Sequence, residues 1–269
     1  MQHVKEIVAK LLATLTGNSA GQKILQKLVF YANYLMGVGS GANASTSGEA
    51  AILQDISQLG KLPLVIFDVG ANKGQFLHLA LQKNSSVSME VHCFEPSKAA
   101  FDILTKSFGN CANVFLNNFA LAASENTASL YYDKPASGLA SLTKRRLEHH
   151  GIANDFCEIV KIKTIDSYCN AKHIKKINLL KIDVEGHELE VLKGAGKMFD
   201  SFAIDAVTFE FGGCNIDTRT FFQDYWYFFR DLKMNLYRVT PSGYLHPIPT
   251  YQESFEQMST TNFYAKLHF

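Results

Sequence analysis

The sequence lacks an excess of either charge and lacks a long apolar run, and each absence excludes a class of protein. Charged residues make up 19% of the 269 residues and the net charge is +1. The chain therefore lacks the basic field that non-specific nucleic-acid binding needs, and we expect no nucleic-acid partner. No stretch of 18 apolar residues occurs, so we expect no transmembrane helix. Hydrophobic residues account for 47%, which is enough for a core and argues against global disorder.

Cysteine is also scarce, and its five copies are scattered. They stand at positions 93, 111, 157, 169 and 214, and none forms a C-x-x-C pair. This spacing argues against a disulfide framework and against a zinc site, so we expect no structural metal and a reducing, cytoplasmic compartment. The short basic run Lys144-Arg145-Arg146 is interpreted as the solvated face of a helix, with contact to an acidic substrate as the alternative.

The N-terminal quarter differs from the rest of the chain in its pattern of apolar residues. Apolar residues recur at helical spacing over residues 2–15 and 20–36, which predicts two amphipathic helices. Residues 37–48 are rich in glycine and serine, which predicts a flexible linker or a mobile lid, and a short helix follows to about residue 59. We expect a helical extension over residues 1–60 and a second domain over 61–269. The extension has three possible roles: covering a site, forming a homo-oligomer, or binding weakly to a membrane surface.

From residue 62 onward, short apolar runs alternate with amphipathic helices. Buried strands are predicted at residues 62–67, 89–94, 114–116, 177–182 and 203–211, which is the pattern of a doubly wound parallel sheet. Helices are predicted at 188–198 and 221–232, and strands at 235–240 and 262–268 would close the sheet as an antiparallel hairpin. Two short strands, at 128–132 and 158–165, flank a polar excursion over residues 133–155 that is long enough to be functional.

The most informative local feature is the turn after the first strand. It reads Asp68-Val69-Gly70-Ala71-Asn72-Lys73-Gly74. Glycines let the backbone approach a ligand, and the helix start offers free N–H donors. Glu95 ends the second strand 21 residues after Gly74, where an acidic residue binds ribose hydroxyls in nucleotide folds. Both features also fit a purely structural turn and a helix-capping carboxylate.

The chemistry of this turn favours S-adenosylmethionine (SAM) over NAD. The turn lacks the G-x-G-x-x-G spacing of a dinucleotide site, and Asp68 precedes its first glycine. A pyrophosphate disfavours a nearby carboxylate, whereas SAM carries a sulfonium and an ammonium and no phosphate. The predicted C-terminal hairpin is a further difference, because a dinucleotide fold does not require it.

Longer segments carry a likeness to a known family. They are Val65-Ile66-Phe67-Asp68-Val69-Gly70-Ala71-Asn72-Lys73-Gly74, Phe94-Glu95-Pro96, Thr164-Ile165-Asp166-Ser167-Tyr168, Lys181-Ile182-Asp183-Val184-Glu185-Gly186-His187-Glu188 and Phe209-Glu210. Together they resemble the FkbM family of SAM-dependent methyltransferases, and the segment that begins at Lys181 is the specific part. The resemblance implies a Rossmann-like, seven-stranded class I methyltransferase sheet. It also implies methylation of hydroxyl oxygens on sugars and natural products, without naming the acceptor.

Site residues are carried over from the family position by position. The resemblance implies that Asp68, Gly70, Ala71, Asn72 and Gly74 surround the amino-acid end of SAM. It implies further that Glu95, with Pro96, binds the ribose, and that adenine lies beside Asn118, Phe119 and Ala120. Phe119 is equally plausible as a core residue.

Methyl transfer to a hydroxyl needs alignment and a base. Asp183, which is also assigned to the cofactor site, is the first choice for the residue that faces the methyl group, and Glu185 and His187 are the competing bases. The same segment also fits helix capping. Asp183 with Glu210 as a divalent-cation site is a possible but less favoured reading. Part of the acceptor wall is assigned to the excursion, through His149, His150 and residues 137–141.

Three functions remain open at this point. The first is a SAM-dependent methyltransferase acting on the oxygen of a small-molecule or glycan acceptor. The second is an NAD-type oxidoreductase, which the turn and the hairpin disfavour. The third is a SAM-fold protein that binds or assembles without catalysis.

Overall fold

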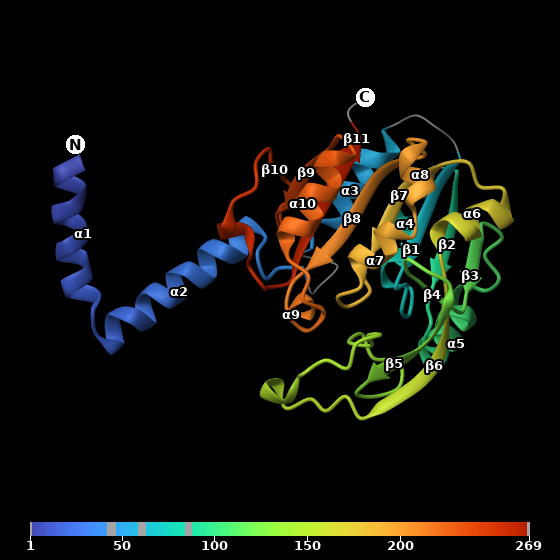
Figure 1. Cartoon of the computed structure of the whole chain (residues 1–269), viewed down its shortest axis with the longest axis horizontal. Coiled ribbons are helices and arrows are strands. Elements are labelled where there is room, and N and C mark those ends of the chain that lie inside the picture. The colour runs from blue at the N-terminus through green and yellow to red at the C-terminus, as the bar shows by residue number, and fades with distance from the viewer. Residues whose placement is uncertain (1, 42–46, 59–62, 84–87, 268–269) are drawn as a thin grey trace.

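An eight-stranded mixed sheet organises the body of the chain in this computed structural model, which describes residues 2–41, 47–58, 63–83 and 88–267 (Figure 1). The strand order is β10-β9-β11-β8-β7-β1-β2-β3. The strands are β1 (Leu64–Val69), β2 (Met89–Phe94), β3 (Val114–Asn117), β7 (Ile177–Ile182), β8 (Ile204–Phe211), β9 (Met234–Val239), β10 (Leu245–Pro247) and β11 (Thr261–Leu267).

Five neighbouring strands pair in parallel, and the remaining three join the sheet through antiparallel pairing. β3, β2, β1, β7 and β8 run in one direction. β11 inserts antiparallel between β8 and β9. The predicted class I methyltransferase sheet and its C-terminal hairpin are therefore confirmed, and β10 is an unpredicted eighth strand at the edge. All six residues of β7 are buried, as expected for a strand covered by helices on both faces.

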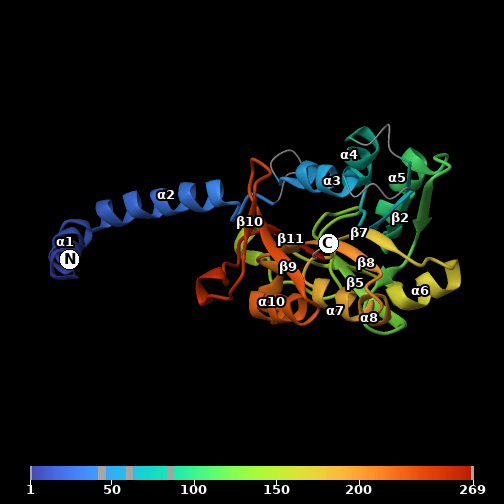
Figure 2. The ribbon, with the colours of Figure 1, turned by 90° about the horizontal axis from the view of Figure 1, so that it is seen from above.

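Helices cover the sheet on both sides (Figure 2). One face carries α3 (Glu49–Ser57), α4 (Gln75–Lys83) and α5 (Lys98–Phe108), and the other carries α6 (Ile165–Lys172), α7 (Glu188–Lys193), α8 (Gly196–Asp200) and α10 (Phe222–Asp231). A short helix, α9 (Cys214–Thr218), follows β8. Ile52, Leu53 and Ile56 of α3 are fully buried in the core that lies between these helices and the sheet. α3 thus packs as part of the body, although the predicted boundary at residue 60 would separate it.

The predicted helix over residues 188–198 is broken into α7 and α8. A side chain at Gly194 would place its Cβ 2.2 Å from the carbonyl oxygen of Ala122. The Gly194 carbonyl also accepts the N–H of Asp166 at 3.0 Å. These contacts with distant segments interrupt the helix.

A second, three-stranded sheet carries the polar excursion. It comprises β4 (Ala120–Leu121), β6 (Phe156–Lys163) and β5 (Asn126–Tyr132), and β5 and β6 form a long antiparallel ribbon. The excursion between them contains the 3-10 turn Glu148–His150. The predicted strand over 158–165 ends earlier, because the hydroxyl of Thr164 accepts the Ser167 N–H at 3.0 Å and begins α6.

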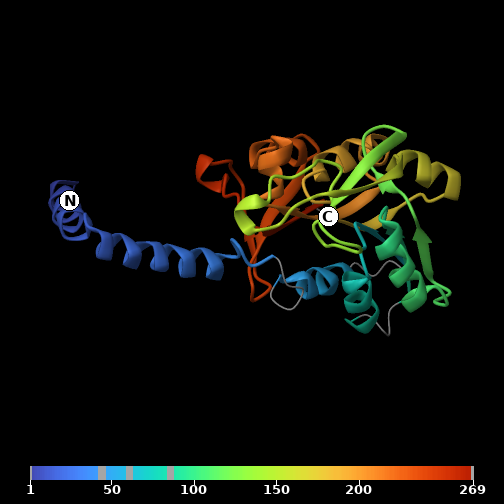
Figure 3. The ribbon, with the colours of Figure 1, turned by 90° about the horizontal axis from the view of Figure 1, so that it is seen from below.

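Two N-terminal helices project from the body as an arm. α1 (Gln2–Thr16) and α2 (Ser19–Met36) extend away from both layers in all three views of the chain (Figures 1–3). α2 contains no buried residue. No helix in the described ranges has the length and apolar character needed to cross a bilayer.

The segment after α2 is packed rather than free. Gly37 has φ +97°, and a Cβ there would lie 2.2 Å from the carbonyl oxygen of Val239. Val38 and Ser40 are 7% and 5% exposed. The predicted flexible linker is therefore wrong for residues 37–41, and residues 42–46 lie outside the described part. The 3-10 turn Glu253–Phe255 completes the elements.

Candidate active site

A cavity of about 570 Å³ lies at the carboxyl ends of β1, β2 and β7. This is where ligands bind in open α/β sheets. The sequence-predicted residues that line it are Gly70, Ala71, Asn72, Glu95, Pro96, Ala120, Asp183, Glu185 and His187. Asp68, Gly74, Asn118 and Phe119 are not among the lining residues. The three strand ends therefore converge on one crevice, with four of the expected residues behind its wall.

The glycine turn contains three residues with positive φ: Gly70, Asn72 at +46°, and Gly74. Gly70 has φ +80°, and a Cβ there would lie 1.8 Å from the carbonyl oxygen of Asp183. Gly70 thus lets β1 and β7 close together at the cavity. Gly74 has φ +89°, and its missing Cβ makes room for the ring of Phe108 on α5, 2.5 Å away. Gly74 therefore serves helix packing in this structure.

Glu95 fixes the turn from the neighbouring strand. One carboxylate oxygen accepts the Asn72 N–H at 2.8 Å, and the other accepts the Ser97 N–H at 2.8 Å. Burial raises the pKa of Glu95 to about 7 against the opposing effect of these two donors. Lone pairs remain on both oxygens for a ligand hydroxyl.

Asn118 and Phe119 support this region from behind. The Asn118 amide donates to the carbonyl oxygens of Glu95 at 2.9 Å and Pro96 at 3.1 Å. The Phe119 ring packs against Phe94 and Tyr168. Phe119 is half-buried and packs against the margin of the core. The cofactor contacts of both residues stay predictions.

A buried ion pair lies beneath the cavity floor. Asp68 on β1 and Lys181 on β7 are direct partners in the strand register, and Lys181 Nζ lies 3.2 Å from the Asp68 carboxylate. Lys181 Nζ also lies 3.4 Å from the Asp183 carboxylate. Burial alone would lower the pKa of Lys181, but Asp68, Asp183 and Glu49 outweigh it and raise the pKa. Lys181 stays an ammonium ion and compensates Asp68, so the charge of Asp68 no longer argues for SAM by itself.

Asp183, Glu185 and His187 reach the cavity from the turn after β7. The Asp183 side chain is 41% exposed. Glu185 has φ +56°, a left-handed conformation rare for a residue with a side chain. The fully buried Glu188 holds this turn by accepting the N–H groups of Val184 at 3.1 Å and Gly186 at 3.0 Å. The capping function thus belongs to Glu188, which leaves the other three side chains facing the cavity.

The cavity-facing side chain of His187 is neutral near pH 7. Burial lowers the pKa of His187 below its usual value, against a smaller opposing effect of Glu190. Its Nε2 lies 2.9 Å from the hydroxyl oxygen of Thr143, in the excursion. A neutral imidazole has one nitrogen lone pair that can accept a proton.

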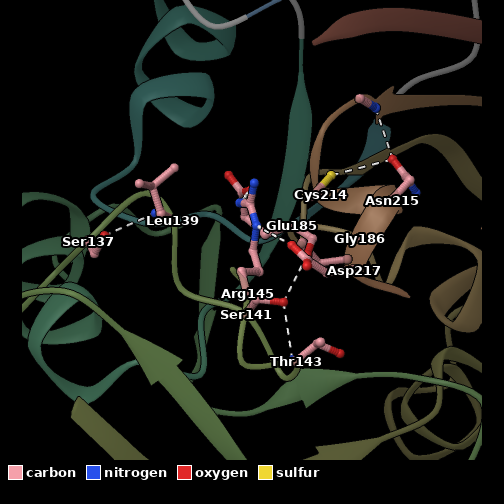
Figure 4. A network of polar contacts seen from close by, with 12 residues as sticks. Ser137, Leu139, Ser141, Thr143, Arg145, Glu185, Gly186, Cys214, Asn215 and Asp217 are labelled. Carbon is pink, nitrogen blue, oxygen red and sulfur yellow. Dashed lines mark hydrogen bonds and ion pairs between the residues drawn. The ribbon is translucent and has the colours of Figure 1, made fainter. Parts of the chain in front are cut away.

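Arg145 is a site residue that the sequence interpretation missed (Figure 4). Its side chain is only 9% exposed, forms an ion pair with Glu185 and lies 3.8 Å from Asp217. The solvated-face interpretation is therefore wrong for Arg145. Burial, with a contribution from Asp183, raises the pKa of Glu185 to about 8, and Arg145 opposes that rise.

The excursion forms the outer wall, as its composition predicts. Residues 137–141 and His150 line the cavity. Ser141 donates its hydroxyl to the Glu185 carbonyl at 2.8 Å, which ties this wall to the turn after β7 (Figure 4). His149 is exposed and is not a lining residue.

Two further acidic residues, Glu49 and Glu210, line the cavity. Burial raises the pKa of both, and the neighbouring carboxyl groups, Asp183 among them, add to the rise. Across residues 2–41, 47–58, 63–83 and 88–267, no three His, Cys, Asp or Glu side chains are grouped as metal ligands. The divalent-cation reading of Asp183 and Glu210 stays a hypothesis.

One side-chain acceptor of the glycine turn has no hydrogen-bond partner. The Asn72 side chain donates to the Ser137 carbonyl at 3.3 Å, but its buried Oδ1 has no hydrogen-bond partner. A buried acceptor without a donor is costly. Because Asn72 lines the cavity, an ammonium group placed there would remove this cost.

Comparison with known proteins gives matches at the level of sequence and of structure. Residues 68–236 match the family described as the methyltransferase FkbM domain. The hexuronic acid methyltransferase AglP of Haloferax volcanii is 28% identical over 148 residues, which is 55% of this chain and 56% of that protein. The chain thus matches little more than half the length of this curated relative.

Two solved structures also match, at lower sequence identity. Methyltransferase FkbM from Methylobacillus flagellatus matches with a TM-score of 0.47 and 13% identity, covering 77% of this chain and 45% of that chain. A SAM-dependent O-methyltransferase from Thermotoga maritima matches with a TM-score of 0.42 and 12% identity, covering 85% and 66% of the two chains.

Proposed function

This chain belongs to the FkbM family of methyltransferases, and from that premise we propose that it transfers the methyl group of SAM to a hydroxyl oxygen of a sugar or other small acceptor. The observation that carries the proposal is the convergence of the 70–72 turn, Glu95 and Asp183 on one cavity. The name of the relative, a hexuronic acid methyltransferase, supports a sugar acceptor. The family membership also leaves the NAD alternative without support.

The residues that would hold SAM fit its chemistry. The buried Oδ1 of Asn72 would accept from the ammonium of the amino-acid end, beside the tight turn that Gly70 allows. Glu95 would accept from ribose hydroxyls, and Ala120 and Pro96 would flank the nucleoside. When bound, SAM supplies a methyl group already activated by a positively charged sulfur.

The protein's own contribution is alignment and removal of the acceptor proton. Asp183 is the best-placed side chain to orient an acceptor hydroxyl, because it is exposed to the cavity and anchored by Lys181. The neutral imidazole of His187 is a second proton acceptor. Glu185 is the third, and its pKa of about 8 and its ion pair with Arg145 set its protonation state.

Calorimetry with SAM and with NADH tests the cofactor, and a methyl-transfer assay with a panel of hexoses and hexuronic acids tests the reaction. We expect SAM binding without NADH binding. Asp183→Asn should leave SAM affinity nearly unchanged and lower kcat by about 10²–10⁴-fold. The matched control is Asp102→Asn on the exposed surface of α5, which should change neither. NADH binding without SAM binding would refute the proposal. Full turnover by Asp183→Asn would refute the catalytic assignment, and SAM binding without transfer to any acceptor would favour a non-catalytic module.

A further inference from the structure

The N-terminal arm concentrates exposed apolar surface in a way that the body does not. Eight large apolar side chains of α2 are between 38% and 72% exposed, and four on α1 are between 53% and 64% exposed. The other exposed large apolar side chains among the described residues are scattered over the body. Contiguous apolar surface of this extent marks an interaction site.

Seven of the eight exposed apolar side chains of α2 form one broad face, and Phe30 lies outside it. Ile24, Leu28, Tyr31 and Leu35 follow a spacing of four, three and four residues, and a second row lies beside them. Gln22, Gln26 and Asn33 lie on the opposite side of the helix. The face covers nearly half the circumference, which is wider than the narrow seam of a coiled coil.

The charge of the arm is of one sign. Lysines stand at positions 5, 10, 23 and 27, and Glu6 is the only acidic residue before Glu49. Two copies of this arm packed together would bring like charges close to one another. An anionic surface complements both the apolar face and the lysines.

We infer that α1 and α2 form a reversible anchor that lies in the plane of an anionic lipid surface. The apolar face of α2 enters the boundary between headgroups and acyl chains, and Lys10, Lys23 and Lys27 contact the anionic headgroups. Because α2 has no buried residue, this docking requires no unfolding of the body.

The arm is joined to the cavity by a short, fixed connection. The Gly41 N–H donates to the Thr260 carbonyl at 3.1 Å, and both residues line the cavity. Only residues 37–41 separate the end of α2 from this wall. An arm docked on a lipid surface therefore holds the cavity close to that surface.

Sedimentation of the full chain with vesicles tests the inference. We expect binding to vesicles of phosphatidylcholine with one-third phosphatidylglycerol and much weaker binding to pure phosphatidylcholine. Leu28→Gln and Leu35→Gln should each weaken binding about tenfold or more. Removing Lys23 and Lys27 by substitution with Gln should weaken it about fivefold per lysine, and raising the salt concentration should act in the same direction.

Polar-face variants provide the matched control. Gln22→Ala and Gln26→Ala change the same helix on its opposite side and should leave vesicle binding within about twofold. Thermal unfolding of every variant should match the unmodified chain, because no buried side chain of α2 is altered. Equal binding to neutral and anionic vesicles would overturn the inference. A second outcome would also overturn it: the chain does not bind vesicles, and sedimentation velocity shows a dimer that Leu28→Gln dissociates. A second copy of the chain would then be the partner of the apolar face.

Discussion

The Asp68–Lys181 pair should stabilise the fold by coupling two buried charges across β1 and β7. The Asp68 side chain is fully buried and that of Lys181 is 8% exposed, with 3.2 Å between their charged atoms. Removing one partner of a buried pair costs about 3–5 kcal/mol, because the remaining charge loses both water and its partner. Lys181 keeps a contact with Asp183 at 3.4 Å, so Asp68→Val should cost about 3 kcal/mol.

A double-mutant cycle measures this coupling. Lys181→Met should cost about 4 kcal/mol, since no other cation among the described residues forms an ion pair with Asp68. The double variant Asp68→Val with Lys181→Met replaces the pair by apolar side chains and should lie within about 1–2 kcal/mol of the unmodified protein. Urea unfolding followed by the fluorescence of Trp226, the single tryptophan, reports the free energy of unfolding.

The control is the exposed pair Lys98–Asp102, whose side chains are 66% and 59% exposed. Asp102→Val should change the unfolding free energy by less than about 1 kcal/mol. The reasoning fails if Asp68→Val leaves unfolding unchanged but abolishes SAM binding. Asp68 would then contact the cofactor directly, as the family resemblance implies, instead of acting through Lys181.

Four further predictions concern single positions. Gly70→Ala should lower SAM affinity by more than tenfold in calorimetry and also lower the melting temperature, because φ is +80° and the new Cβ would overlap the Asp183 carbonyl oxygen; unchanged affinity would show that the turn relaxes. Thr164→Ala should cost about 1 kcal/mol in urea unfolding through loss of the α6 cap, whereas the exposed Ser107→Ala should cost little. Burial raises the pKa of Glu188 from 4.5 to about 7, so the folded state binds a proton on the Glu188 carboxyl more tightly than the unfolded state does. The stabilisation from this proton is complete below pH 4.5 and decreases by up to about 3 kcal/mol as pH rises through 7. Glu188→Gln should remove that slope, and a difference between the two proteins that does not vary with pH would contradict the sign. Arg145→Gln removes the cation that lowers the pKa of Glu185. If Glu185 accepts the proton of the acceptor hydroxyl, the acidic side of the plot of kcat against pH should therefore move to higher pH. An unchanged plot would leave Asp183 or His187 as the base.

The parallel strands were predictable because burial on both faces leaves a simple pattern. The run Ile177–Ile182 has the same limits in the sequence prediction and in the structure, as does Met89–Phe94. Boundaries set by distant contacts were not predictable. The break between α7 and α8 depends on the approach of Gly194 to Ala122, more than 70 residues earlier in the chain.

The site was predictable where residues follow strand ends and was missed where charges pair across the fold. Lys181 is a lysine within an otherwise largely apolar buried strand, and this was the available signal; its register with Asp68 is known only from the fold. Arg145 gave no such signal, because its partner Glu185 is 40 residues away in sequence and the neighbouring Lys144 and Arg146 are exposed. Glu185 and Glu188 are three residues apart, and only the fold separates a cavity side chain from a capping one.

The ribbon of β5 and β6 allows the outer wall of the cavity to change in sequence and length independently of the main sheet. The excursion leaves the ribbon at Tyr132 and returns at Phe156, and these two residues are paired across the strands with stacked rings 5.9 Å apart. A longer or shorter excursion would still begin and end at this pair of residues. The entropic cost of closing a loop grows only slowly with its length, so such changes would cost little stability. Acceptor preference can therefore diverge through changes in this one segment, while the 70–72 turn and Glu95, which belong to the main sheet, stay unchanged.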